Sequence, residues 1–352
     1  MQRSSVVDLF CGIGGLTHGF VKEGFNVVAG IDADETCKYA YEKNNSATFI
    51  KRDVEGMAAG EIIGLYPKGD TKILVGCAPC QPFSRYTIRK DEDDKWKLLR
   101  SFAKLIRDVQ PEIVSMENVP ELKDHLVYNE FTEALDAENY FVSTHVVYSP
   151  DYGIPQTRER LVLFASKYSE IEIIKPTHSR KHYRTVRDTI EHLEPLEAGQ
   201  TSVKDPLHQA RRLSELNLRR IRNTPPGGGW KDWDEELVLD CHKATTGRSY
   251  SSVYGRMKWD EPSPTMTTHC GGLGNGRFGH PEQHRAISLR EAALFQTFPI
   301  SYKLIQPGAK VTNKTLSRQI GNAVPVRLGR IIARTIRKHL EELHHAQQSS
   351  KI

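Results

Sequence analysis

The chain has 352 residues, of which 38% are hydrophobic and 26% charged, a composition ordinary for a globular protein of about two domains. Its 49 Lys and Arg against 44 Asp and Glu give a formal net charge of +5, which permits an anionic partner without demanding one. The longest apolar runs are only a few residues, such as Ile73-Leu74-Val75, and the N-terminal segment reaches a glycine turn too early for a signal peptide. We therefore exclude membrane and secreted classes and expect a cytoplasmic protein.

Short apolar runs alternate with amphipathic stretches through the first half of the chain, which is typical of βαβ units. This alternation predicts an α/β fold with a doubly wound, mostly parallel sheet. The predicted strands are Val6–Phe10, Phe25–Ile31, Thr48–Ile50, Lys72–Val75, Ile113–Glu117, Tyr140–Tyr148 and Arg160–Ala165. The predicted helices run from the glycine turn to about Glu23 and over Glu35–Asn44, Lys95–Val109 and Asn129–Glu138.

From about Ile171 the alternation stops. Residues 171–285 carry eight of the 14 histidines and are rich in Gly, Pro and aromatic residues. Their 18 Lys and Arg against 15 Asp and Glu leave only +3, but the basic side chains cluster in 175–187 and 211–222. We expect a second, smaller and irregular domain here, after which helical patterns return at Ser288–Gln296 and Val326–Leu343.

A glycine-rich turn, Cys11–Gly15, follows the first strand and opens a helix, where glycines let the backbone approach a ligand closely. A dinucleotide site would space its glycines differently. Asp32, at the end of the next strand, could accept hydrogen bonds from a ribose, and Asp53 from an adenine amino group. An adenosine-bearing ligand without pyrophosphate, of which S-adenosylmethionine is the common one, fits best. A tight turn with no ligand explains this motif equally well.

Cys80 lies between two prolines on a polar loop after a strand, in the crevice where such sheets bind ligands. A thiolate there would be a nucleophile. Glu117 ends the following strand and should reach the same crevice, where a buried carboxyl group could donate a proton at neutral pH. Arg158 and Arg160 could hold oxygens and charge, although a structural salt-bridge pair also explains them.

The six cysteines are expected to be free thiols in a reducing compartment. Cys77 and Cys80 form a C-x-x-C pattern, but no second pair or suitably spaced histidine completes a zinc site, so we expect no metal.

With these pieces in view, the chain resembles the cytosine-5 DNA methyltransferase family of bacterial modification enzymes. Six motifs stand in that family's usual order between residues 8 and 325, so the resemblance spans nearly the whole chain. They are DLFCGIGG (8–15), PCQPFS (79–84), ENVPEL (117–122), QTRER (156–160), REAALFQTFP (290–299) and IGNAVP (320–325).

The resemblance implies that a cytosine is flipped out of the duplex and that Cys80 attacks its C6. Glu117 would protonate or hydrogen-bond N3, and C5 would then take a methyl group from S-adenosylmethionine. Arg158 and Arg160 would contact the base or orient the site. The implied cofactor-binding residues are Phe10, Cys11, Gly12, Ile13, Gly15, Asp32, Ala33, Asp53, Val54, Pro79, Asn322 and Val324.

The resemblance also implies double-stranded DNA as the partner. A loop with Ser84, Arg85 and Arg89 would close over the DNA, and residues 171–285 would be the target-recognition domain. Candidate DNA contacts in that domain are Arg248, Arg256, Thr265 and Thr267. The catalytic and cofactor-binding domain would comprise 1–170 and 286–345, followed by a tail, 346–352. One site per chain favours a monomer, and a cognate restriction endonuclease, where one exists, would act separately.

Three other interpretations are weighed against this one. A tRNA cytosine-5 methyltransferase is disfavoured because the CFT tripeptide of that branch is absent. A non-catalytic DNA-binding homologue is disfavoured because Cys80 and Glu117 are intact. A nicotinamide oxidoreductase conflicts with the glycine spacing.

Overall fold

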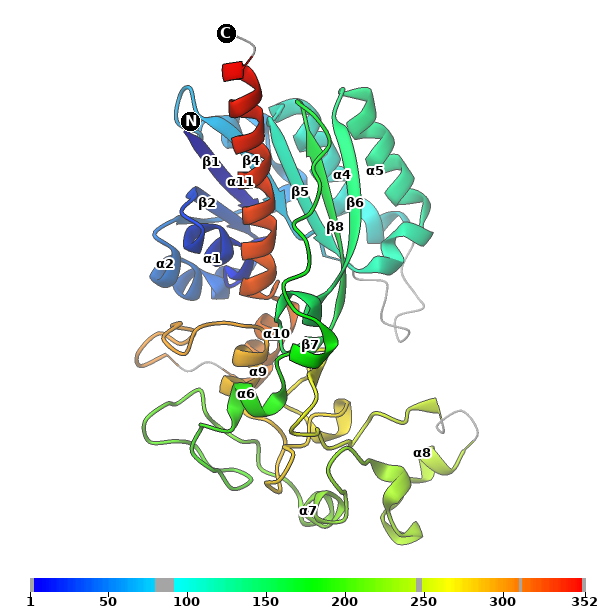
Figure 1. Ribbon diagram of the computed structural model, residues 1–352. Helices are drawn as coiled ribbons and strands as arrows, with labels where there is room; N and C mark the ends of the chain where they lie inside the picture. The colour runs from blue at the N-terminus through cyan, green and yellow to red at the C-terminus, as the bar shows by residue number, and fades with distance from the viewer. Residues whose placement is uncertain (1–2, 80–91, 245–248, 310–311, 350–352) are drawn as a thin grey trace. The chain divides into compact units, whose positions relative to one another are not determined.

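The computed structural model describes residues 3–79, 92–244, 249–309 and 312–349 (Figure 1). The chain divides into two compact units. The first comprises Met1–Tyr148, Glu159–Pro176 and Val326–Ile352, and the second comprises Ser149–Arg158 and Thr177–Pro325. The second unit is larger than the irregular segment 171–285 expected from the sequence, because it also takes in 149–158 and 286–325.

The first unit is built on a seven-stranded sheet with the order β3-β2-β1-β4-β5-β8-β6. The first five of these strands pair in parallel, and β8 runs antiparallel between β5 and β6. This confirms the predicted α/β fold with a mostly parallel sheet. The strands are β1 (Ser4–Leu9), β2 (Asn26–Asp32), β3 (Thr48–Lys51), β4 (Thr71–Gly76), β5 (Ile113–Asn118), β6 (Phe141–Tyr148) and β8 (Glu159–Ser166).

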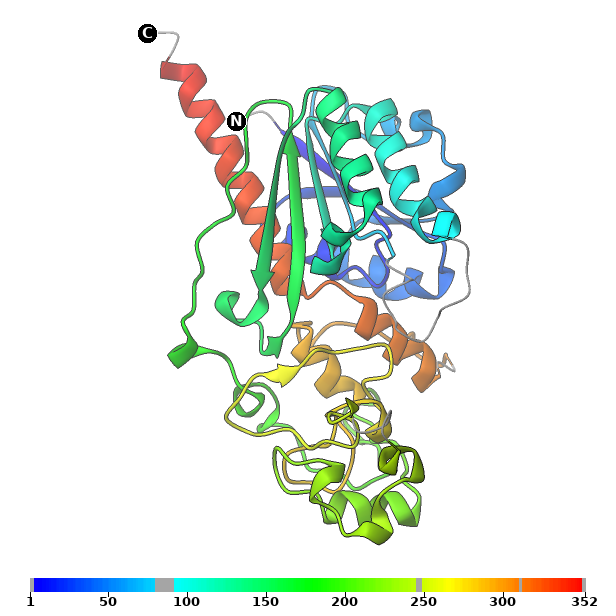
Figure 2. The ribbon, with the colours of Figure 1, turned by 90° about the vertical axis from the view of Figure 1, so that its right-hand side faces the viewer.

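Helices cover both faces of the sheet. The adjacent residues Val6 and Val7 point to opposite faces and are both 0% exposed, as expected for a doubly wound parallel sheet. One face carries α4 and α5, and the other carries α1 and α11 (Figure 2). The helices of this unit are α1 (Gly15–Lys22), α2 (Lys38–Asn45), α3 (Ala59–Ile63), α4 (Glu92–Val109), α5 (Leu126–Ala137) and α11 (Val326–Ser349).

The helix boundaries of this unit differ from the sequence prediction at several points. α2 begins at Lys38 rather than Glu35, and α4 begins at Glu92 rather than Lys95. α5 begins at Leu126 rather than Asn129, and the short helix α3 was not predicted. α11 continues to Ser349, beyond the predicted end at Leu343, so that residues expected to form a tail are helical. No glycine or proline follows Leu343 to stop the helix, which explains its extra length.

The last helix packs on the first. α1 and α11 cross so closely that a Cβ atom added at Gly19 would lie 2.4 Å from the carbonyl carbon of Gly329. Glu23, which follows α1, forms ion pairs with Arg330 and Arg334 of α11 at 2.6 and 2.9 Å. This crossing brings the two ends of the chain to the same unit.

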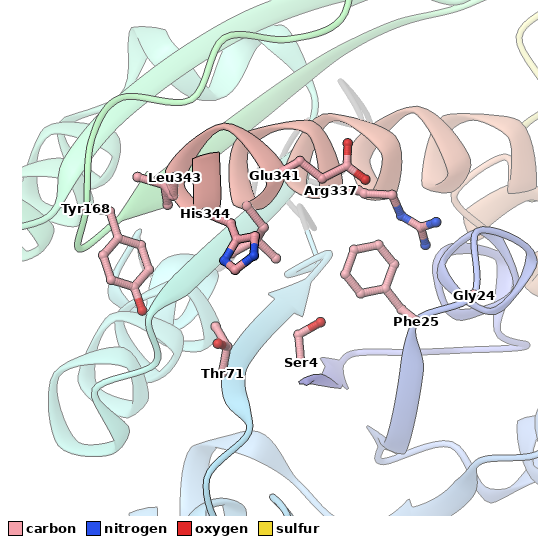
Figure 3. Close-up of a pocket in the computed structure, with 10 residues that line it drawn as sticks. Ser4, Gly24, Phe25, Thr71, Tyr168, Arg337, Glu341, Leu343 and His344 are labelled. Atoms are coloured by element: carbon pink, nitrogen blue, oxygen red, sulfur yellow. The ribbon is translucent and has the colours of Figure 1, made fainter. Parts of the chain in front are cut away.

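A pocket of about 310 Å³ lies between the first residues of β1 and β4 and the C-terminal part of α11 (Figure 3). It is lined by Ser4 and Thr71, the first residues of β1 and β4, and by His344 of α11. The guanidinium group of Arg337 lies 5.1 Å from the centre of the Phe25 ring beside it. Because β1 and β4 begin here, this pocket is at the edge of the sheet opposite the carboxyl ends of the strands.

The second unit contains short elements and much irregular chain, as expected for residues 171–285. Part of its interior is polar: Arg285 and Glu291 are each 1% exposed and pair at 2.8 Å. Two short strands, β7 (Gln156–Thr157) and β9 (Ser263–Pro264), pair in parallel. The helices are α6 (Val186–Ile190), α7 (Glu215–Arg222), α8 (Asp240–Lys243), α9 (Leu289–Phe295) and α10 (Asn313–Asn322). Among the helices of the described ranges, none combines the length and apolar character that crossing a membrane requires.

Candidate active site

Glu117 lies near the carboxyl end of β5, a strand in which every residue is buried. Its side chain is 3% exposed, and Nε of Arg160 lies 3.1 Å from its Oε1. Arg160 belongs to β8, which pairs antiparallel with β5 and so carries the guanidinium group to the end of β5. Within the described residues Oε1 accepts no hydrogen bond, although it is buried and faces this cation. A buried acceptor of this kind is rare in folded proteins and is common at functional sites.

The other oxygen of Glu117 contacts a cysteine. Cys77 follows β4, which pairs in parallel with β5, and its Sγ lies 2.8 Å from Oε2 of Glu117. Nearby, Nδ2 of Asn118 donates to the carbonyl oxygen of Ala78 at 3.4 Å. The chain that leads toward Cys80 is therefore held against the end of β5 as far as Ala78. Cys80 itself lies outside the described residues.

The carboxyl end of β1 carries the glycine turn. Phe10 and Gly12 adopt left-handed backbone conformations, with φ of 58° and 51°. The amide of Gly12 donates to Oδ2 of Asp32 at 2.8 Å, and the amide of Asp34 donates to Oδ1 at 2.8 Å. A Cβ atom added at Gly12 would meet nothing within 4 Å, so open space adjoins this turn. The turn and Asp32 thus form one hydrogen-bonded edge beside an open volume.

Burial raises the pKa of two side chains, one at the end of β1 and one in the glycine turn. Burial raises the pKa of Asp8 to about 7, and Thr17 donates a hydrogen bond of 2.6 Å to its Oδ2. Burial also raises the pKa of the Cys11 thiol well above its ordinary value. Cys11 is therefore a neutral thiol at physiological pH and not a nucleophile.

The remaining predicted cofactor residues fall into two groups. In the first unit, Ile13 and Val54 are buried, and Ala33, Asp53 and Pro79 are exposed, with Gly15 opening α1. Asp53 accepts a hydrogen bond from the amide of Glu55 at 3.0 Å. Asn322, the last residue of α10, and Val324 belong to the second unit.

The two candidate arginines of the QTRER motif have different environments. Arg160 belongs to the first unit and contacts Glu117, whereas Arg158 belongs to the second. Arg158 is 4% exposed, and its Nη1 donates to the carbonyl oxygen of Met266 at 3.1 Å. Arg160 therefore contacts the carboxylate of Glu117, whereas Arg158 joins two segments of the second unit by its hydrogen bond to Met266.

Arg256, expected at the DNA surface, is 3% exposed. Its guanidinium group donates to the carbonyl oxygens of Ile221, Thr224, His280 and Gln283 at 2.6–2.8 Å. Burial lowers its pKa to about 10, which leaves it charged at neutral pH. A side chain enclosed in this way holds loops together and is not available to a phosphate, so the expectation for Arg256 is corrected.

Thr265 is half-buried and donates to the carbonyl oxygen of Thr157 at 2.8 Å, and Thr267 is exposed. Ser84, Arg85, Arg89 and Arg248 lie outside the described residues. Within the described ranges, no group of three or more His, Cys, Asp or Glu side chains is placed to hold a metal ion.

Sequence reasoning missed the contact between Cys77 and Glu117. The C-x-x-C pattern by itself indicates only half of a zinc site. The position of Cys77 could have indicated the contact, because Cys77 directly follows the strand that neighbours the strand of Glu117.

Comparisons with known proteins agree with this geometry. Residues 4–338 match the family model described as C-5 cytosine-specific DNA methylase. The chain is 56% identical over 347 residues to the Type II methylase M.HgiDII of Herpetosiphon aurantiacus, covering 98% of each chain. It is 29% identical to the Type II methyltransferase M1.HphI of Haemophilus parahaemolyticus, covering 94% of this chain and 86% of that one.

Solved structures share the fold. An E. coli prophage protein assigned as a DNA modification methyltransferase superposes with a TM-score of 0.73 at 21% identity, covering 96% of this chain and 99% of that chain. The Entamoeba histolytica methyltransferase EhMeth gives a TM-score of 0.66 at 17% identity, covering 97% and 99%. The chain therefore belongs to the C-5 cytosine-specific DNA methylase family and is a DNA cytosine-5 methyltransferase.

Proposed function

We propose that the chain methylates C5 of a cytosine flipped out of double-stranded DNA within a short specific sequence, through a covalent bond between Cys80 and C6. The observation that carries this proposal is the state of Glu117: a buried carboxyl oxygen, 3.1 Å from Arg160, that accepts no hydrogen bond in the described ranges. A pyrimidine edge entering beside β5 would supply the missing partner.

Cys80 is the proposed nucleophile. Attack of its thiolate on C6 breaks the aromaticity of the ring and places negative charge on N3 and C5. Glu117 protonates or hydrogen-bonds N3, which stabilises that charge and makes the addition possible. Arg160 keeps the carboxyl group in place. After C5 has taken the methyl group, its proton is lost to solvent, the electrons of that C–H bond restore the C5–C6 double bond, and Cys80 leaves as a thiolate.

The residues at the carboxyl ends of β1, β2 and β3 fit S-adenosylmethionine. The open volume at Gly12 admits a ligand against the backbone, which any side chain there would fill. Asp32 would bind ribose hydroxyl groups, Asp53 the adenine amino group, and Phe10 one face of the base. When bound, the cofactor supplies the electrophilic methyl group that C5 takes up. The remaining cofactor contacts are proposed for Cys11, Ile13, Gly15, Ala33, Val54, Pro79, Asn322 and Val324.

DNA contacts are proposed for Ser84, Arg85 and Arg89 in the loop after Cys80, and for Arg248, Thr265 and Thr267 in the target-recognition segment. The similarity to Type II methylases supports a short specific target. A cognate restriction endonuclease, where one exists, would act separately. Basic side chains would position the phosphates, and a few polar side chains would read base edges.

The test is to express the chain in a host whose DNA lacks 5-methylcytosine and to map that base genome-wide by bisulfite sequencing. The expected result is 5-methylcytosine at one cytosine of one short sequence, and none with the Cys80→Ser variant. Methylation at an exocyclic amino group, or in RNA but not in DNA, would contradict the proposal.

A further inference from the structure

Cys77 and Glu117 lie at the ends of two neighbouring parallel strands. Gly76, the last residue of β4, pairs with Met116 of β5, so Cys77 and Glu117 are the next residues in register. Sγ of Cys77 lies 2.8 Å from Oε2 of Glu117. Cys77 is half-buried and Glu117 is 3% exposed, so water screens this contact only weakly.

The short distance requires a proton between the two groups. Two anions this close in a poorly hydrated site would repel strongly, so thiolate and carboxylate do not occur together. The proton lies on the sulfur, which donates it to Oε2 of Glu117.

Glu117 is thus held from two sides by groups of the same unit. The thiol of Cys77 donates to Oε2, and Nε of Arg160 lies 3.1 Å from Oε1. The thiol fixes one oxygen with a hydrogen bond, whereas the oxygen facing Arg160 keeps its acceptor capacity. This division leaves Oε1 as the oxygen for a ligand and fixes the plane of the carboxyl group before any ligand enters.

We propose that Cys77 is a positioning residue of the methyl transfer, whose thiol orients the Glu117 carboxyl group. The inference rests on the proposed function, in which Glu117 must carry or share a proton at N3 of cytosine. It assigns the two cysteines of the C-x-x-C pattern different tasks: Cys80 attacks the base, and Cys77 acts only through Glu117.

The proposal predicts a split between kcat and KM. Without the hydrogen bond from Cys77, the plane of the Glu117 carboxyl group is no longer fixed, so the chemical step slows while DNA binding is little affected. A cysteine that merely filled space would not be replaced in function by a residue whose only shared feature is a hydrogen-bond donor.

The first experiment compares kcat and KM for the wild type and the Cys77→Ala, Cys77→Ser and Cys241→Ala variants. Cys77→Ala should lower kcat severalfold, with KM for DNA changed less than about twofold. Cys77→Ser keeps a donor and should restore most of kcat. Cys241 is an exposed cysteine of α8, and its replacement should leave kcat and KM unchanged. An unchanged kcat in Cys77→Ala, or equal losses in Cys77→Ala and Cys77→Ser, would overturn the proposal.

If Cys77→Ala does not fold, a second measurement tests the contact between Cys77 and Glu117. The rate of iodoacetamide alkylation at Cys77 is followed against pH by tandem mass spectrometry in the wild type and in Glu117→Gln. Removing the neighbouring negative charge should move the onset of Cys77 alkylation to lower pH, and identical curves would refute the contact. Because alkylation needs neither DNA nor turnover, this result stands apart from the proposed function, which fails only if the wild type does not methylate DNA.

Discussion

Asp32 and Gly12 join the ends of β2 and β1: the Gly12 amide donates to Oδ2 of Asp32 at 2.8 Å. The second oxygen of Asp32 accepts from the amide of Asp34. One carboxylate therefore fixes the glycine turn at the ends of two neighbouring strands.

Replacing Asp32 by Ala should lower affinity for S-adenosylmethionine at least about tenfold, because the hydrogen bonds that hold the turn and the proposed ribose contact would both be lost. Affinity for DNA should change far less. Calorimetric titration of each ligand checks this. Asp70, which accepts a hydrogen bond from Ser5 at the opposite edge of the sheet, provides the control, and Asp70→Ala should bind the cofactor normally. Equal losses for both ligands in Asp32→Ala would remove the ribose role.

Gly19→Ala should destabilise the first unit by about 2 kcal/mol or more, because its Cβ atom would collide with the backbone of Gly329 across the α1–α11 crossing. Gly60 on α3 is the matched control. A Cβ atom there meets nothing within 4 Å, so Gly60→Ala should stabilise the protein by about 0.5 kcal/mol. Urea unfolding followed by circular dichroism distinguishes the two variants, and equal midpoints would contradict the close crossing.

Asp8 makes stability depend on pH. Its pKa rises from 3.8 to about 7 on folding, because burial disfavours the charged form. The folded state then binds a proton that the unfolded state has lost, so this contribution is complete below about pH 4 and is lost as pH rises to 7. Asp8→Asn, which stays neutral, should gain about 2 kcal/mol relative to the wild type between pH 5 and pH 7.5. Unfolding curves at both pH values provide the test, and a constant difference would contradict the buried neutral acid.

Arg256→Ala should destabilise the second unit by about 3 kcal/mol, because four carbonyl oxygens lose a charged donor. Arg222→Ala, at an exposed position on α7, should change stability by less than about 0.5 kcal/mol. Thermal unfolding measures the difference. If Arg256→Ala kept its full stability and lost only DNA affinity, the structural role would be wrong.

The sheet, and the edge of it that carries the candidate site, could be predicted from the sequence because both follow from local patterns. Buried strands appear in the sequence as apolar runs, and parallel strands bring the residues after their carboxyl ends to one edge of the sheet. Asp32, Cys77 and Glu117 reach that edge from separate parts of the chain for this reason. The end of α11 was missed because its last residues are polar, although nothing in them stops a helix.

What the sequence could not predict depends on contacts between distant segments. Arg256 looked like a surface cation because its acceptors are backbone oxygens, which leave no trace in side-chain composition. Arg158 and Arg160 are two positions apart, yet they fall in different units, since the boundary passes between them. The Cys77–Glu117 contact required the strand register, which residue spacing alone does not supply.

The central claim, that Cys80 forms a covalent bond to the target cytosine, can be tested by trapping. DNA carrying 5-fluorocytosine at the target is incubated with the enzyme and S-adenosylmethionine, then digested and analysed by mass spectrometry. Fluorine at C5 cannot leave as a proton does, so the account predicts a stable DNA adduct on Cys80. The Cys80→Ser variant should bind the same DNA and form no adduct. An adduct on another residue, or full turnover by Cys80→Ser, would contradict the account.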